Sequence, residues 1–371
     1  MPLTAKERLE KQGSYEKARI LEYWQNMPYS LKVAHARTLV RDFYDNPEVP
    51  RCHISVGGLD SITLTLFIRS LGYTADEVPA ISVSMLEDKS IQKVHKALGV
   101  IALAPAKSKV QVIREYGYPI ISKKVAANIE LLQKPATRTR TLRHALITGE
   151  TGHFGGDQKD SRMKMADKWL HLFGGADPEG AALGYKAAPF RVSDKCCFWL
   201  KEKPVQDYQK ENDSYPYLGL MASEGGRREF ALKHYGCNWV SPTTKRSCPF
   251  ASFMRDDILQ LALDMDKWYQ EHWQEINPDP ADRVESIIPE IYGQIVKDSE
   301  GHLKTTGAER TGCSMCAFGV EREKRPNRYD RLYERNPKEW HFYMYEMGFG
   351  EVLDYIGVEW RHDAEQVAMD I

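Results

Sequence analysis

The sequence predicts an α/β fold, in which N-terminal helices are followed by a doubly wound, mostly parallel sheet. Short apolar strands alternate with helices between residues 51 and 103, at the period typical of parallel strands with crossover helices. Gly57 and Gly58 stand between the first strand and the first helix of this pattern, as in the opening unit of such a sheet. From about residue 270 the chain is rich in Trp, Tyr, Pro and charge, which predicts a C-terminal helical and loop subdomain.

The elements follow from the spacing of apolar residues and from the breaks between them. The first half is expected to contain helices within 5–46, a strand at Arg51–Val56, a helix at Ser61–Leu71, a strand at Val78–Met85, a helix at Ser90–Leu98 and a strand at Val100–Leu103. The second half is expected to contain an amphipathic helix near Met163–Phe173, a strand at Leu218–Ala222, a helix at Asp256–Tyr269 and a helical region that includes Trp340–Tyr355. The predicted division is a helical segment at 1–50, a nucleotide-binding type of α/β domain at 51–265 and a subdomain at 266–371.

Composition narrows the class of protein. The 371 residues suffice for one large domain with additions or for two domains, and 42% hydrophobic residues support a proper core. A net charge of −1 gives no overall field that favours nucleic acid or a membrane surface. We expect no membrane span, because no run of about eighteen apolar residues occurs. Seven cysteines without an export signal argue against a disulfide framework and predict a cytoplasmic protein with reduced thiols.

The glycine turn is a candidate anion site. It reads VGGLDS over Val56–Ser61, and glycines let backbone N–H groups approach an anion closely. The N-terminus of the following helix adds partial positive charge and free N–H donors. Ser61 can donate its hydroxyl to a phosphate oxygen, and Asp60 can instead cap the helix. The alternative interpretation is an ordinary tight turn between a strand and a helix.

Two pairs of cysteines are candidate metal ligands. Cys196 and Cys197 are adjacent in KCCFWLKEKP, and Cys313 and Cys316 form a CxxC in TGCSMCAFG. Four sulfur donors suit an iron–sulfur cluster or a zinc ion, and adjacency, which is unusual for structural zinc, favours the cluster. Cys237 and Cys248 are alternates for one member of the adjacent pair; as buried small hydrophobes they would need no metal.

These motifs resemble a known family. VGGLDS resembles the SGGxDS pyrophosphate loop (PP-loop) of the adenine-nucleotide α-hydrolase superfamily, which includes ATP pyrophosphatases and the adenylylsulfate and phosphoadenylylsulfate reductases. Val56 stands in place of the first serine of that loop, with Ser55 one position earlier. KCCFWLKEKP and TGCSMCAFG resemble the paired cysteine signatures of the cluster-containing reductases. The similarity runs from about residue 50 to 360, and it is closest to uncharacterised bacterial and phage members.

The resemblance implies a set of site residues and cofactors. It implies an adenine nucleotide, with Mg²⁺ where that nucleotide is ATP, and a 4Fe-4S cluster. The nucleotide-binding residues would be Ser55, Gly57, Gly58, Leu59, Asp60, Ser61, Arg227 and Arg228, and the cluster ligands Cys196, Cys197, Cys313 and Cys316. Glu224 and Arg310 are further charged candidates near these motifs. No catalytic residue is assigned.

Three functions are expected from this pattern. The leading one is an enzyme that cleaves ATP between its α- and β-phosphates, to activate an acceptor for sulfur transfer or for nucleic-acid modification. The second is a non-catalytic subunit that binds nucleotide and cluster, in a modification or phage-defence system with a protein or nucleic-acid partner. The third is a sulfonucleotide reductase, a less favoured reading because no cysteine follows Cys316 to attack sulfur. An oligomer is compatible with each.

Overall fold

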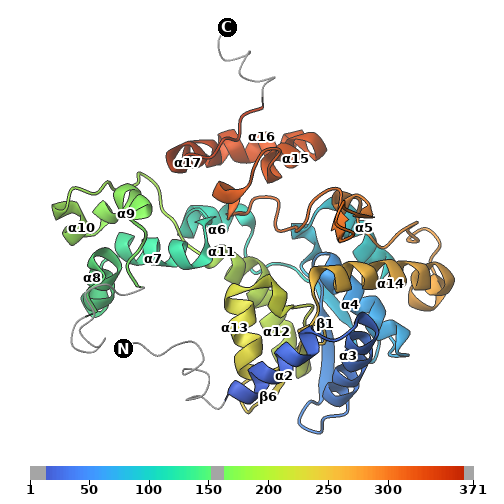
Figure 1. Cartoon of the computed structure of the whole chain (residues 1–371). Helices are drawn as coiled ribbons and strands as arrows, with labels where there is room; N and C mark the ends of the chain where they lie inside the picture. The colour runs from blue at the N-terminus through green and yellow to red at the C-terminus, as the bar shows by residue number, and fades with distance from the viewer. Residues whose placement is uncertain (1–13, 152–162, 363–371) are drawn as a thin grey trace. The chain divides into compact units, whose positions relative to one another are not determined.

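The computed structural model describes residues 14–151 and 163–362 (Figure 1). These residues divide into two compact units. Unit 1 takes in the described residues of 1–104 and 203–313, and unit 2 those of 105–202 and 314–371. Each unit is therefore built from two separate stretches of chain. The boundaries predicted near residues 50 and 265 both fall inside unit 1, and the three-part division stays a prediction.

Unit 1 contains a six-stranded mixed sheet in the order β3-β2-β1-β5-β7-β6. Neighbouring strands run parallel except β6 and β7, which are antiparallel. The α/β class and the mostly parallel sheet are thus confirmed, whereas the doubly wound arrangement stays a prediction. The strands are β1 Arg51–Ser55, β2 Ala80–Ser82, β3 Ile101–Ala102, β5 Ser214–Tyr217, β6 Asn238–Val240 and β7 Lys245–Ser247, and a separate antiparallel pair is formed by β8 Ile295–Lys297 and β9 Leu303–Thr305.

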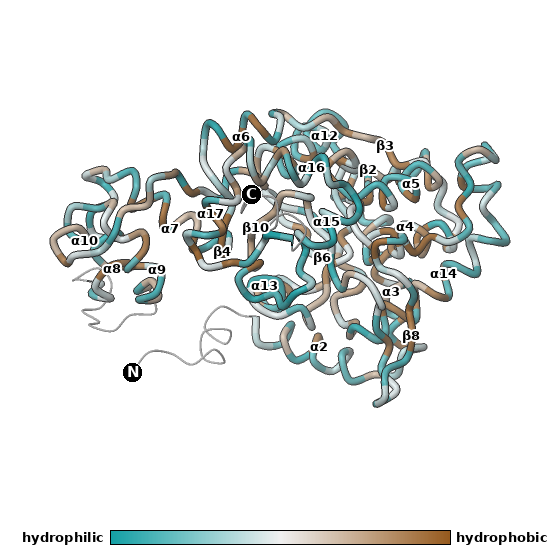
Figure 2. The backbone as a smooth tube through the Cα atoms, turned by 90° about the horizontal axis from the view of Figure 1, so that it is seen from above, coloured by the Kyte–Doolittle hydropathy of each residue, from teal (hydrophilic) through white to brown (hydrophobic). Residues whose placement is uncertain are grey.

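The centre of unit 1 is the strand–turn–helix unit that the sequence predicts. β1 is buried over Cys52–Ile54 and leads through Gly57 and Gly58 into α4, which spans Leu59–Ser70. α4 is one of the apolar helices in Figure 2, and nine of its twelve residues are buried. A helix with buried residues on all its faces must be covered on every side. α4 packs against β1 and against the long helix α14, Arg255–Ile276.

The remaining helices of unit 1 are α2 Tyr15–Gln25, α3 Tyr29–Tyr44, α5 Lys89–Ala97, α12 Lys203–Asn212 and α13 Gly226–Tyr235, with short 3-10 turns at Ser84–Leu86, Ala222–Glu224 and Glu290–Tyr292. The helix expected at Ser90–Leu98 is present as α5, whereas the sequence did not predict α12 and α13. α2 and α3 fall within the helical region expected at 5–46, of which residues 5–13 lie outside the described residues. The helix expected at Asp256–Tyr269 is present as α14, which begins one residue earlier and continues for seven more.

One strand prediction is wrong. Residues Leu218–Ala222 are not a strand; the chain instead pairs with β1 four residues earlier, as β5. The sequence did not predict β5 because it contains Pro216. Proline lacks an N–H group and usually argues against a position inside a sheet. The sheet accommodates it: Pro216 lies in register with His53 of β1, and only Tyr217 of β5 pairs with β7.

His53 is a fully buried histidine at the centre of β1. Its Nδ1 lies 2.9 Å from the Ser214 hydroxyl of β5, and the edge of its ring meets the ring of Tyr208 in α12. Its Nε2 is buried and makes no hydrogen bond among the described residues. Burial lowers the pKa of His53 to about 4, so that the ring is neutral in the folded protein at neutral pH.

Unit 2 is mainly helical. Its elements are α6 Lys109–Tyr116, α7 Lys123–Gln133, α8 Arg140–Thr148, α9 Asp167–Phe173, α10 Pro178–Ala182, α11 Lys195–Cys197, a π-helical turn at Phe198–Glu202, α15 Arg328–Arg335, α16 Pro337–His341, a π-helical turn at Phe342–Glu346 and α17 Phe349–Ile356. Two short strands, β4 Ile120–Ile121 and β10 Ala317–Phe318, pair in parallel and join its two stretches of chain. Fully buried aromatic residues, among them Trp340, Tyr329 and Phe349, form its core.

Two further expectations concern the helical C-terminal region and membrane spans. The helical C-terminal region is present as α15 to α17, whereas residues 266–313 belong to unit 1. In the part of the chain that the structure describes, none of the helices combines the length and apolar character needed to cross a membrane.

Candidate functional site

Ser61, the last residue of the glycine loop, forms hydrogen bonds with the backbone of that loop. β1 ends at Ser55 and α4 begins at Leu59, with Gly58 as the N-cap residue. The Gly57 N–H donates to Ser61 Oγ at 2.8 Å, and Ser61 Oγ donates to the Gly58 carbonyl at 2.9 Å. In this arrangement the Ser61 proton faces a backbone carbonyl, so the hydroxyl must rotate before it can donate to a phosphate.

A tyrosine from a distant part of unit 1 covers the start of α4. The Leu59 N–H donates to the Tyr292 hydroxyl at 3.1 Å, and that hydroxyl lies 2.7 Å from Thr311 Oγ1. A Cβ atom on Gly58 would stand 2.3 Å from the Tyr292 hydroxyl oxygen and 2.9 Å from Thr311 Oγ1. Position 58 therefore admits only glycine while Tyr292 is in place. Burial raises the pKa of Tyr292, which keeps the phenol neutral.

A histidine forms a hydrogen bond with the other side of the loop. The Nε2 atom of His95 in α5 lies 2.8 Å from the Gly57 carbonyl, and its Nδ1 lies 2.9 Å from the Ser84 hydroxyl. Because a carbonyl only accepts hydrogen bonds, these partners assign the proton to Nε2 and make Nδ1 the acceptor from Ser84. His95 thus ties the loop to the turn that follows β2.

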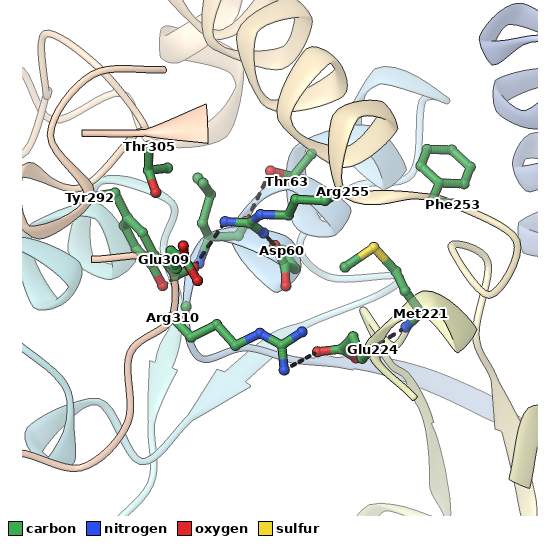
Figure 3. Close-up of polar contacts among 12 residues, drawn as sticks. Asp60, Thr63, Met221, Glu224, Phe253, Arg255, Tyr292, Thr305, Glu309 and Arg310 are labelled. Carbon is green, nitrogen blue, oxygen red and sulfur yellow. Dashed lines mark hydrogen bonds and ion pairs between the residues drawn. The ribbon is translucent and has the colours of Figure 1, made fainter. Parts of the chain in front are cut away.

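Two acid–arginine groups surround the loop (Figure 3). Asp60 does not cap α4; its carboxylate lies 3.0 Å from the Arg255 guanidinium, which also donates to the Glu309 carbonyl at 2.9 Å. Burial raises the pKa of Asp60, and the nearby Arg255 works against that shift. The carboxylate of Glu224 is 4% exposed and lies 3.3 Å from the Arg310 guanidinium.

The remaining residues predicted to bind the nucleotide are either paired, exposed or buried. Arg228 pairs with Glu224, and Arg227 is exposed on α13. The Ser55 hydroxyl is buried and makes no hydrogen bond among the described residues. Val56 is buried in the apolar core of unit 1.

Sequence reasoning missed Tyr292, Thr311 and Arg255 as residues of this site. Tyr292 lies 233 residues from the amide that it contacts. No motif around these three residues indicates that they meet the loop. Only the fold, which brings α14 and residues 290–311 to the end of β1, reveals them.

The first cysteine pair lies in unit 2. Cys196 and Cys197 end the short helix α11, with their Sγ atoms 4.0 Å apart. A hydrogen bond from Cys196 and the charge of Lys123 lower the pKa of Cys197 to about 6. Two sulfurs on one tetrahedral zinc ion would stand about 3.8 Å apart, given a Zn–S distance of about 2.3 Å. Ligands at two corners of a cubane stand farther apart, so a cluster would require these side chains to rotate.

The second pair spans the division of the chain. Cys313 is the last residue of unit 1 and Cys316 lies in unit 2. Burial raises the pKa of Cys316, while the nearby charges of Arg328 and Lys201 lower it and that of Cys197 raises it. Among residues 14–151 and 163–362, no three Cys, His, Asp or Glu side chains gather closely enough to hold a metal ion. The four sulfur donors fit an iron–sulfur cluster or zinc in kind, because such groups prefer soft ligands. Lys123 lies near Cys197, and Arg328 and Lys201 lie near Cys316, so positive charge is present beside these thiols.

The alternate cysteines lie in unit 1. Cys248 is fully buried against Leu21 and Ala251, with Cys237 packed beside them. Burial raises the pKa of Cys237 to about 11 and that of Cys248 to about 12, which keeps both thiols protonated at neutral pH. In these surroundings both act as small apolar side chains.

Comparison with protein-family models, with curated proteins and with solved structures gave no match for this chain.

Proposed function

We propose that unit 1 binds an adenine nucleotide at the glycine loop. The observation that carries this proposal is the position of the loop at the carboxyl end of β1. β2 and β3 follow on one side of β1, and β5 and β7 lie on its other side. In a doubly wound sheet, the arrangement that we propose here, the crevice at such a reversal of strand order is where ligands bind. The N–H groups of a helix N-terminus at that point suit a phosphate.

The charged residues around the loop support a polyphosphate ligand. Arg228, Arg255 and Arg310 provide guanidinium groups, which suit phosphate recognition. Asp60 and Glu224 are carboxylates near the loop that pair with these arginines. Mg²⁺ is bound in proteins by one or two carboxylates together with substrate phosphates, so we assign these two residues to the Mg²⁺ that accompanies ATP.

The favoured reaction is cleavage of ATP between the α- and β-phosphates, by a PP-loop protein of the phosphoadenylylsulfate reductase-like kind. A nucleophile of the acceptor would attack the α-phosphorus, the bond to the bridging oxygen would break, and pyrophosphate would leave with the electron pair. Cationic groups and Mg²⁺ stabilise the charge that develops on the leaving group. The acceptor is then left adenylated.

This proposal is tested by equilibrium dialysis of ATP and Mg²⁺, followed by measurement of released pyrophosphate. We expect ATP to bind, and pyrophosphate to appear when an acceptor is supplied. Arg310→Met removes a guanidinium beside the loop and should weaken ATP binding. Arg283→Met removes a guanidinium that lies over Trp273 and should leave it unchanged. Failure of the wild-type protein to bind ATP would overturn the proposal.

The internal hydrogen bonds of the loop favour one alternative. Gly57 and Leu59 donate to side chains of the protein itself, and Val56 offers no hydroxyl in place of the first serine. A subunit that binds nucleotide without cleaving it, within a modification or phage-defence system, needs no stronger phosphate site. Binding of ATP without pyrophosphate release, with every acceptor tried, would support this alternative.

We further propose that Cys196, Cys197, Cys313 and Cys316 hold a 4Fe-4S cluster, which would supply an electron-transfer centre. Lys123, Lys201 and Arg328 would offset its negative charge; the last also donates to the Cys316 carbonyl at 2.8 Å. The chain would then be a nucleotide-binding iron–sulfur protein.

Replacing Cys313 with serine is expected to remove the cluster. Protein purified without oxygen should contain about four irons per chain, as one cubane on four cysteines requires, and Cys313→Ser should contain almost none. Cys237→Ser is the matched control and should keep its iron, since Cys237 is only an alternate ligand. Iron and visible absorbance are the measurements. Stoichiometric zinc in the wild-type protein, or loss of iron in Cys237→Ser alone, would contradict this ligand set.

A further inference from the structure

The hydroxyl of Tyr292 accepts a hydrogen bond from the first N–H group of α4. Leu59 is the first residue of α4, and its N–H is one of the donors that a helix N-terminus offers to an anion. In the structure that N–H donates to Tyr292 Oη at 3.1 Å. A backbone N–H that two acceptors share is poorly aligned with at least one of them, so a phosphate oxygen and the phenol oxygen would compete for it.

The surroundings hold this hydroxyl in place. Thr311 Oγ1 lies 2.7 Å away, and Tyr292 is 3% exposed. The backbone of Tyr292 is fixed as well, because its N–H donates to the Pro289 carbonyl and its carbonyl accepts from the Gly307 N–H, each at 2.9 Å. The part that can leave is therefore the phenol, by movement of the side chain.

We propose that Tyr292 is an internal competitor for the phosphate chain of the nucleotide, and that it sets the affinity of the loop. This inference rests on the proposed function. The neutral phenol takes the acceptor position at Leu59 while the loop is empty, and Thr311 retains it there. A nucleoside triphosphate or pyrophosphate binds the full set of loop donors only after displacing the phenol, and so with reduced affinity.

Removing only the hydroxyl separates this role from that of the ring. In Tyr292→Phe the Leu59 N–H has no internal partner. The net worth of one hydrogen bond predicts that ATP and inorganic pyrophosphate, each with Mg²⁺, bind about three- to ten-fold more tightly. Thr311→Val loosens the phenol without removing it and should tighten binding by a smaller factor. Both affinities are measured by titration calorimetry on the full chain.

Tyr269→Phe is the matched control. Tyr269 is another buried tyrosine of unit 1, and its hydroxyl also accepts from a backbone N–H, that of Val284 at 3.4 Å. Removing the Tyr269 hydroxyl should leave the affinities for ATP and for pyrophosphate unchanged. Thermal unfolding of each variant shows whether the fold is retained, and Thr311→Val provides the test if Tyr292→Phe does not fold.

Hydrogen exchange gives a readout that needs no ligand. The Leu59 amide should exchange faster in Tyr292→Phe than in the wild type, and pyrophosphate should restore its protection. Equal or weaker binding by Tyr292→Phe, with a wild type that binds, would overturn the inference and make the phenol a contact of the phosphate. Absence of ATP binding in both proteins overturns the proposed function itself, and the inference with it.

Discussion

Gly58→Ala is expected to lower the free energy of unfolding by about 2 kcal/mol, through one lost hydrogen bond and local overpacking. The new Cβ would stand 2.3 Å from the Tyr292 hydroxyl oxygen and 2.9 Å from Thr311 Oγ1, closer than packed atoms allow. Tyr292 would have to move, which breaks its contact with the Leu59 N–H. Denaturant unfolding at neutral pH measures this loss.

Gly57→Ala is the matched control for that prediction. A Cβ on Gly57 would meet only Glu87 Oε1 and Ser61 Oγ, both at 3.9 Å, which is ordinary contact. Its unfolding free energy should stay within about 0.5 kcal/mol of the wild-type value. The double variant Gly58→Ala with Tyr292→Phe should regain part of the loss, because the nearest ring atom, Cζ, lies 3.6 Å from that Cβ. Equal destabilisation by the two alanines would exclude the steric explanation.

His53 is expected to make the protein acid-sensitive. Its pKa is about 4 in the folded protein because of burial, against about 6.5 in the unfolded chain. As pH falls from about 6.5 to 4, the unfolded state binds a proton that the folded state does not, so stability falls with pH. A difference of about 2.5 pKa units corresponds to about 3 kcal/mol, all of it present above pH 6.5 and lost by pH 4.

The check is the pH dependence of the unfolding free energy between pH 7 and 4. His53→Gln keeps a polar group beside Ser214 and removes the titrating ring, so its stability should fall less steeply with acid than that of the wild type. His341→Gln changes an exposed histidine of unit 2 and should follow the wild-type curve. A wild-type slope that survives in His53→Gln would show that other groups cause the acid sensitivity.

The sequence was most informative where structure is local. The short strand pattern Arg51–Val56 before Gly57, and the mainly apolar run Ser61–Leu71 after Gly58, suffice to predict β1 and α4 to within two residues at each end. β5 could not be predicted in this way, because Pro216 gives it the local signature of a loop, and its pairing with β1 depends on residues far away in the chain.

The candidate site shows the same limit. The contact between the Gly57 N–H and the Ser61 hydroxyl is local, because only four residues separate the two groups along the chain. Tyr292 and Arg255 reach the loop only through the packing of α14 and of residues 290–311, and no short-range pattern encodes such contacts. The cysteines fall between these cases: their chemistry is readable from the sequence, whereas Cys313 and Cys316 belong to different units.

Residues 309–311 contact the loop and immediately precede the second cysteine motif in the chain. Three consecutive residues bind around the loop: the Glu309 carbonyl to Arg255, Arg310 to Glu224 and Thr311 to Tyr292. Cys313 follows two residues later, so the contacts around the loop and the first thiol of this motif lie on one short segment of unit 1. Thermodynamic reciprocity then applies: if filling the loop changes metal affinity by some factor, loading the metal changes nucleotide affinity by the same factor.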